Sequence, residues 1–192
     1  MYFFQQYDSI KIIEELGVWI VELFDILDEN GNPTGLKKDR NSVHTDGDWH
    51  GSVHIWIIQE NKTLLQKRSR TKDSFPLCFD AACTGHIDSG EEPLNAAVRE
   101  INEELSLKIN INNLRFLFCQ KLCIHNDKFI SNEFNYVYIL DRYVHDFELS
   151  FQEEEIEQLL WTDTDKLMQE LEHNNPDYCI KYEEYKKVLE MI

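Results

Sequence analysis

The stretch from Gly85 to Leu107 constrains the fold and the function of this chain more than any other. Apolar residues recur in it at steps of three and four, at Leu94, Ala97, Val98, Ile101 and Leu105. This spacing predicts an amphipathic helix. Glu100, Glu103 and Glu104 recur at the same steps and form a purely acidic face, which costs ~0.2–0.5 kcal/mol of repulsion per pair. Carboxylate oxygens grouped in this way suit hard divalent cations.

A solvated helix face is the alternative interpretation of three acids at helical spacing, but the surrounding residues favour a binding site. Gly85 and Glu91 precede the helix, and Arg99 stands directly before Glu100. The stretch resembles the Nudix box, whose pattern is Gly, five residues, Glu, seven residues, Arg-Glu, an aliphatic residue, any residue, Glu-Glu, any residue, Gly and an aliphatic residue. The matching positions are Gly85, Glu91, Arg99, Glu100, Ile101, Glu103, Glu104 and Leu107.

One position departs from the box, because Ser106 stands where the pattern has Gly. A helix often ends at such a position with a residue at positive φ, which Gly adopts freely and Ser adopts at a cost. The departure therefore affects how the helix ends more than it affects the residues expected to carry the chemistry.

The bulk composition limits the class of protein and its partners. A chain of 192 residues with 42% hydrophobic content suits one globular domain. A net charge of −17 argues against nucleic acid or an anionic membrane as a partner, because both require basic patches. Five cysteines without a C-x-x-C pair indicate reduced thiols, and no apolar run approaches the ~18 residues that span a bilayer. We expect a cytoplasmic protein.

Hydrophobic patterns and turn residues predict the order of the elements. Residues 36–52 carry no clear period and are predicted to be an ordered loop. The predicted strands are Val18–Leu27, Val53–Gln59, Thr63–Lys67, Phe79–Cys83, Arg115–Leu122, Phe129–Leu140 and Leu159–Trp161. Besides the acidic helix, the predicted helices are a short one around Ser9–Leu16, one capped by Thr162 or Asp163 that runs to about Leu171, and one from Ile180 to Met191.

This mixture of elements predicts an α/β protein with a mixed central sheet covered by helices on both faces. The resemblance implies the same architecture, the α/β/α sandwich of Nudix proteins. We expect one Nudix domain over residues 1–192, with an N-terminal extension at 1–17 and a C-terminal helix at 180–192. The aromatic residues Tyr2, Phe3 and Phe4 are candidates for packing on a second copy in a homodimer or, alternatively, on their own domain.

The resemblance to the Nudix box implies metal-dependent hydrolysis of a diphosphate linkage. Mg²⁺ or Mn²⁺ would be held by Glu100, Glu103 and Glu104 together with the backbone carbonyl of Gly85. Arg99 is expected to point away from the acidic face and to reach back to Glu91, which would fix the loop between them. The general base of this family has no fixed position, so its candidates here are Glu103, Glu104 and Glu133. For Glu133, a lone Glu in a predicted strand, the ordinary expectation is an exposed side chain.

A second group of residues lies mostly upstream of the box and resembles the Nudix branch that contains the isopentenyl diphosphate isomerases. The group consists of Arg40, His44, His50, Arg68, Lys72 and His86. In that branch the positions of the three histidines bind a metal, the positions of the arginines and the lysine hold the substrate diphosphate, and the position of Glu133 is an essential acid. Hydrogen bonding within their own loop is the alternative role for His44 and His50.

Two departures count against isomerase activity. The branch has a catalytic cysteine immediately before the Gly-His pair, whereas this chain has Thr84 there and Cys83 one residue earlier. A displacement of one residue along a strand sends a side chain to the opposite face. The branch also has a carboxylate ligand where this chain has Ser131. The balance favours a hydrolase of a small diphosphate compound, with a nucleoside di- or triphosphate as the leading substrate class. The alternatives are an isomerase and a Nudix domain that senses nucleotides without turnover.

Overall fold

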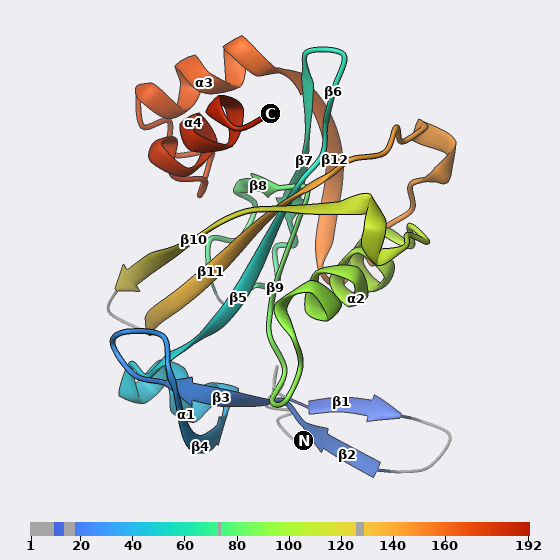
Figure 1. Ribbon diagram of the computed structural model, residues 1–192. Coiled ribbons are helices and arrows are strands. Elements are labelled where there is room, and N and C mark those ends of the chain that lie inside the picture. The colour runs from blue at the N-terminus through green and yellow to red at the C-terminus, as the bar shows by residue number, and fades with distance from the viewer. Residues whose placement is uncertain (1–9, 14–17, 73, 126–128) are drawn as a thin grey trace, which may run out of the picture.

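A computed structural model describes residues 10–13, 18–72, 74–125 and 129–192 (Figure 1). Its largest sheet has six strands in the order β10-β11-β5-β3-β4, with β9 also paired to β5. β5 and β11 run parallel and the other pairs of this sheet are antiparallel, so the predicted mixed sheet is confirmed. The strands are β3 (Leu23–Leu27), β4 (Pro33–Asp39), β5 (Trp49–Trp56), β9 (Cys83–His86), β10 (Leu114–His125) and β11 (Ile130–Leu140).

A second sheet of four strands continues the β-structure beyond the end of β5. β7 is its centre and pairs with β6, β8 and β12. The hairpin predicted before residue 68 is confirmed in this sheet, because Ile58 pairs with Thr63. The strands are β6 (Ile58–Gln59), β7 (Lys62–Arg68), β8 (Phe79–Ala81) and β12 (Ile156–Asp163).

Helices cover both faces of the β-structure, as the α/β/α prediction requires (Figure 1). The predicted acidic helix is α2 (Pro93–Leu105), and its apolar residues pack with Val53 and Ile55 of β5. α3 (Thr164–Glu172) and α4 (Tyr182–Glu190) pack instead with Trp56 of the same strand. Because successive side chains of a strand point to opposite faces, β5 separates two cores. The helix predicted to begin near Thr162 is capped by Asp163, which accepts from Lys166 N.

The predicted loop over residues 36–52 is wrong. This stretch contains the end of β4, the helix α1 (Arg40–Asp46) and the start of β5. Asp39 caps α1 by accepting from Ser42 N, and Gly47 ends it at a φ of 72°. β4 lies at the sheet edge with most of its side chains exposed, so it carries no hydrophobic period from which the sequence could reveal it.

The predictions for the first residues also need correction. Part of the helix expected around Ser9–Leu16 is the strand β1 (Ile10–Ile13), while Ser9 and residues 14–17 lie outside the described residues. β1 forms an antiparallel pair with β2 (Val18–Val21), for which their β-branched residues are suited. The predicted strand Val18–Leu27 is accordingly two strands. Short 3₁₀ turns at Ile111–Asn113 and Asp146–Glu148 complete the elements, and no helix of the described residues is long and apolar enough to cross a membrane.

Candidate active site

The acidic face of α2 lies against the backbone of β9. Gly85 of β9 approaches Glu100 so closely that a Cβ added to the glycine would overlap the glutamate side chain. Glu104 is 6% exposed, and it lies within hydrogen-bonding distance of Thr84 N, at 3.4 Å. The glycine that begins the box is therefore required by close approach of a carboxylate and not by a positive φ.

Two carboxylates of α2 lie close together with little exposure to water, since Glu104 is buried and Glu100 is partly buried. Burial and the neighbouring Glu104 raise the pKa of Glu100 to about 8, even though Arg99 acts to lower it. Burial likewise raises the pKa of Glu104, although Cys83 and Thr84 donate hydrogen bonds to it. A divalent cation would supply the missing positive charge through oxygen ligands. The donor set thus fits Mg²⁺ or Mn²⁺.

Arg99 joins the helix to the loop that precedes it. Its Nε and Nη2 donate to the two carboxylate oxygens of Glu91 at 3.0 and 2.8 Å, and Nη2 also donates to the carbonyl of His86 at 3.0 Å. The predicted link between Arg99 and the loop is confirmed. The expectation that Arg99 points away from the acidic face is wrong, because its Nη1 donates to Glu100 at 2.6 Å and to Glu103 at 3.5 Å. A guanidinium has five N–H groups, so Arg99 can donate to the loop and to the acidic face of α2 at the same time.

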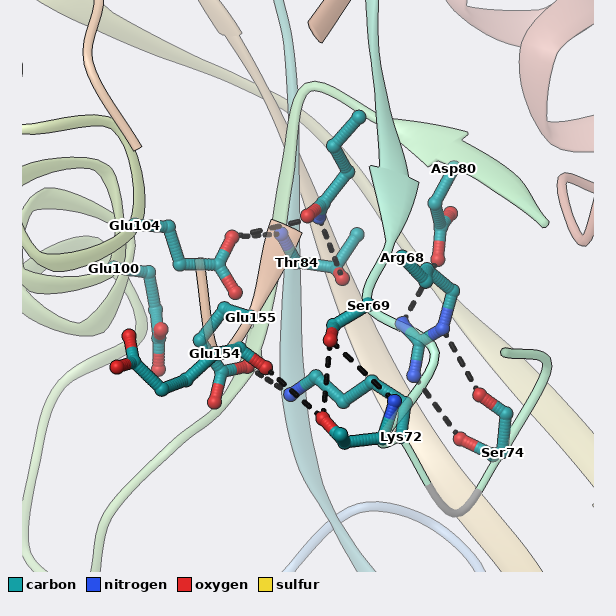
Figure 2. A network of polar contacts seen from close by, with 12 residues as sticks. Arg68, Ser69, Lys72, Ser74, Asp80, Thr84, Glu100, Glu104, Glu154 and Glu155 are labelled. Atoms are coloured by element: carbon teal, nitrogen blue, oxygen red, sulfur yellow. Dashed lines mark hydrogen bonds and ion pairs between the residues drawn. The ribbon is translucent and has the colours of Figure 1, made fainter. Parts of the chain in front are cut away.

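The basic loop after β7 lies opposite the glutamates of α2 (Figure 2). Lys72 forms an ion pair with Glu155, and burial, reinforced by the charge of Arg68, lowers the pKa of Lys72. Arg68 donates to Asp80 at 3.3 Å and to Ser74 O at 3.0 Å. Glu100 and Glu104 also act on the charge of Lys72. The sequence therefore identified two cations that the fold brings to the acidic helix, but not the carboxylates that hold them.

Arg40 adds a third cation to this region. It pairs with Glu22 at 3.4 Å, and its positive charge acts on both Lys72 and His86. The three predicted phosphate-binding residues therefore share one electrostatic environment. Each of the three pairs with one carboxylate: Arg40 with Glu22, Arg68 with Asp80 and Lys72 with Glu155.

The three predicted histidines come together from α1, β5 and β9. One ring nitrogen from each of His44, His50 and His86 lies within 4.8 Å of the others. His50 binds the carbonyl of Asp48 through Nδ1 at 3.0 Å, while its buried Nε2 has no hydrogen-bond partner. Burial and the nearby charge of Arg40 hold the pKa of His86 well below its usual range, which keeps its ring neutral. The neutral ring of His86 and the unpartnered Nε2 of His50 are suited to hold a metal ion.

Glu133 lies beside this histidine cluster, which is formed by His44, His50 and His86. It is 8% exposed, so the expectation of an exposed side chain is wrong. β11 is an interior strand between β10 and β5, and both faces of the sheet are covered there. Ser131 donates to Glu133 at 2.5 Å, and His86 lies 4.0 Å away. Burial acts to raise the pKa of Glu133, but His50 and Ser131 outweigh it and the net pKa is lowered.

Cys83 and Thr84 occupy opposite faces of β9, as the period of a strand requires. Cys83 is fully buried in the core beneath α2, and burial raises the pKa of its thiol. Thr84 pairs with His54 in register and lies 3.4 Å from Gln66 Nε2. The cysteine of this chain is therefore turned away from the face that carries His86.

Several polar residues of the site were missed by sequence reasoning. Gln66 lies 3.4 Å from both Thr84 and Glu104, and Glu155 belongs to the acidic run that precedes β12. Gln66 stands two residues before Arg68 on the same strand, which is a signal that could have found it. Nothing in the pattern around Glu155 distinguishes it from its acidic neighbours.

The fold is an α/β/α sandwich in which the acidic helix α2 packs against Gly85 of β9. This arrangement defines the Nudix class of proteins. The family model of the NUDIX domain matches residues 48–182, and this chain belongs to that family. It is similar to "Nudix hydrolase 3" of Arabidopsis thaliana, with 38% identity over 182 residues. The match covers 89% of this chain but only 23% of the length of that relative.

The predicted resemblance to the isomerase branch is confirmed by a second relative. The chain is 30% identical over 114 residues to an isopentenyl-diphosphate Delta-isomerase of Pectobacterium atrosepticum, covering 59% of this chain and 62% of that protein. Among solved structures, DR0079 of Deinococcus radiodurans superposes with a TM-score of 0.67 at 20% identity, over 88% of this chain and 99% of that chain. This structural likeness supports the fold alone.

Proposed function

We propose that this protein is a Mg²⁺- or Mn²⁺-dependent hydrolase that cleaves a diphosphate linkage in a small molecule, with nucleoside di- or triphosphates and their derivatives as the leading substrates. The observation that carries the proposal is that buried Glu104 and partly buried Glu100 of α2 lie opposite the partly buried Lys72, whose charge they act on. The carboxylates of Glu100 and Glu104 are suited to bind the metal ion, and the ammonium group of Lys72 is suited to bind phosphate oxygens. Together they match the charges of a metal–diphosphate complex.

Each predicted residue has a role in this proposal. Glu100, Glu103, Glu104 and the Gly85 carbonyl would hold the metal, which when bound supplies positive charge to the phosphate oxygens. Lys72, Arg68 and Arg40 would bind the diphosphate and exchange their present carboxylate partners for phosphate oxygens.

The reaction itself requires a base. Water attacks phosphorus, the bond from that phosphorus to the bridging oxygen breaks, and a carboxylate takes the proton of the water. Glu103, Glu104 and Glu133 remain the candidates. Glu133 lies in a separate cluster with His44, His50 and His86, while Glu103 and Glu104 share the helix with the proposed metal ligands. Arg99 and Glu91 would act as positioning residues because they tie that helix to the preceding loop.

A panel of nucleotide and isoprenoid diphosphates, followed by phosphorus NMR with Mg²⁺ or with a chelator, tests the proposal. We expect release of phosphate or a nucleoside monophosphate only with the metal. Glu103→Gln and Glu104→Gln should each lose about 100-fold or more in kcat. Glu172→Gln, at an exposed position of α3, is the matched control and should be unchanged. Full activity of Glu103→Gln and Glu104→Gln would show that the acidic face was assigned wrongly.

An isomerase is the second candidate function, favoured by the histidine cluster with Glu133 beside it and by the similarity to an isomerase. The buried position of Cys83 argues against it, because its thiol lies on the other face of β9. The same NMR experiment decides, since an isomerase would yield a rearranged isoprenoid diphosphate. A nucleotide sensor would bind without turnover. We expect the protein to act without nucleic acid or membrane as a partner.

A further inference from the structure

A group of polar side chains from three strands meets the C-terminal helix on the sheet face that carries His50 and His86. Glu184 of α4 is 2% exposed and lies at its centre. It accepts from His54 Nδ1 at 2.8 Å and Trp56 Nε1 at 3.2 Å through one oxygen. It accepts from Gln120 Nε2 at 2.6 Å and Asn135 Nδ2 at 3.2 Å through the other. These contacts attach α4 to the sheet, but they do not use every polar atom of the group.

Asn135 is left with an unsatisfied acceptor. It is fully buried, and its Oδ1 has no hydrogen-bond partner. The orientation of its amide is determined by Glu184, whose carboxylate oxygen accepts and therefore faces the NH₂ group. A buried acceptor without a donor is unfavourable, so a ligand that donates to it would be bound favourably.

His54 is left with an available donor. Its Nδ1 must carry the hydrogen that faces Glu184, and its Nε2 has no partner among the residues that the structure describes. The side chain is 16% exposed although the Nδ1 end is held by a buried carboxylate. Burial acts against the charge on His54, but Glu184 outweighs it and raises the pKa of His54 to about 9. Both ring nitrogens therefore carry hydrogen near neutral pH.

The donor and the acceptor lie beside the proposed diphosphate site. His54 pairs in register with Thr84, and Gln66 lies 3.4 Å from both Thr84 and Glu104. Asn135 is two residues from Glu133 on the same face of β11. His54 also lies within electrostatic reach of Glu133 and of Asp80, which pairs with Arg68, so the group borders the histidine cluster and a predicted phosphate-binding arginine.

We propose that His54 and Asn135 form a subsite for a hydroxyl-bearing group of the substrate, such as the sugar of a nucleotide, with His54 Nε2 donating to a hydroxyl and Asn135 Oδ1 accepting from one. The inference rests on the proposed hydrolase function and narrows its substrate class. A hydrocarbon chain placed here would leave Asn135 Oδ1 unsatisfied and would remove His54 Nε2 from water without a partner. An isoprenoid diphosphate is therefore disfavoured, and a site built to bind hydroxyl groups discriminates strongly against an analogue that lacks them.

The test compares Asn135→Leu and His54→Gln with Gln120→Leu as the matched control. Gln120 donates to the same Glu184 oxygen as Asn135. Gln120→Leu therefore measures the effect of weakening the attachment of α4 without changing the proposed subsite. His54→Gln keeps an amide donor for Glu184 and removes the ring nitrogen Nε2. The full chain with Mg²⁺ is assayed on ADP, on 2′,3′-dideoxy-ADP and on isopentenyl diphosphate, and binding of the three compounds is measured by calorimetry with Ca²⁺.

We expect Asn135→Leu and His54→Gln to raise KM and Kd for ADP about tenfold while leaving both values for dideoxy-ADP and isopentenyl diphosphate within about twofold. Gln120→Leu should not change the ratio between ADP and dideoxy-ADP. Equal losses on all three compounds, or the same pattern in Gln120→Leu, would overturn the subsite. If the wild-type protein hydrolyses nothing in the broader panel, the hydrolase proposal fails, while the calorimetric comparison still decides whether the subsite exists.

Discussion

Gly85 of β9 and Glu100 of α2 pack so closely that no other residue type fits at position 85 without moving the glutamate. Gly85→Ala should therefore displace the Glu100 carboxylate and lower kcat/KM by about 100-fold, because a displacement of about 1 Å is enough for such a loss. Metal affinity, measured by calorimetry, should fall with it.

Gly35→Ala is the control for this substitution. A Cβ at Gly35 has nothing within 4 Å, but its φ of 84° makes the change strained. It should cost about 1 kcal/mol of unfolding free energy and leave kcat/KM unchanged. If Gly85→Ala instead resembled this control, close approach to Glu100 would not be the reason for the glycine.

Replacement of Arg99 by Lys tests whether the guanidinium fork positions the acidic helix. Lysine keeps the charge but cannot donate to both oxygens of Glu91 and to the His86 carbonyl at once. We expect kcat to fall by about 10- to 100-fold and the unfolding free energy by about 1–3 kcal/mol. Arg115→Lys is the matched control, because its ion pair with Asp141 is exposed and should contribute about 0–1 kcal/mol. Similar losses in both variants would contradict the positioning role.

Ser106 ends α2 at a φ of 52°, as predicted from its place in the box. Ser106→Gly should relieve this strain and raise the unfolding free energy by about 0.5–1 kcal/mol, with kinetics unchanged. Chemical denaturation measures the first quantity and a standard assay the second. Ser106→Ala keeps a side chain at positive φ and should give no gain, so a gain in both variants would mean that the conformation is not the cause.

The ion pair between His54 and Glu184 should make stability depend on pH. The pKa of His54 is about 9 in the folded protein against 6.5 as the ordinary value, so the folded state binds the proton more tightly. The contribution is fully present below pH 6.5 and is lost as pH rises through about 9, with an upper limit of about 3 kcal/mol. Asp80 of β8 and Glu133 of β11 also face this histidine and act in the same direction.

Thermal unfolding between pH 6 and pH 10 measures this dependence. Glu184→Gln removes the main partner of His54 and should flatten the curve between pH 6.5 and pH 9. An unchanged slope in Glu184→Gln would show that other groups cause the dependence.

The sequence by itself determined the acidic helix, the glycine that precedes it and the family. Each of these follows from local spacing: Leu94 to Leu105 give the helix its buried stripe, and the order Gly85, Glu91, Arg99, Glu100 is a pattern along one segment. The hairpins and the helix capped by Asp163 could be predicted for the same reason, because their signals lie within a few neighbouring residues.

Only the tertiary structure decided what these residues contact. The pairing of Lys72 with Glu155 joins positions 83 residues apart, and that of His54 with Glu184 joins positions 130 apart. The burial of Glu133 depends on its strand lying between two others, which its own neighbours do not reveal. Local spacing determines the faces of a helix or a strand, whereas the partner of each face depends on how distant segments pack.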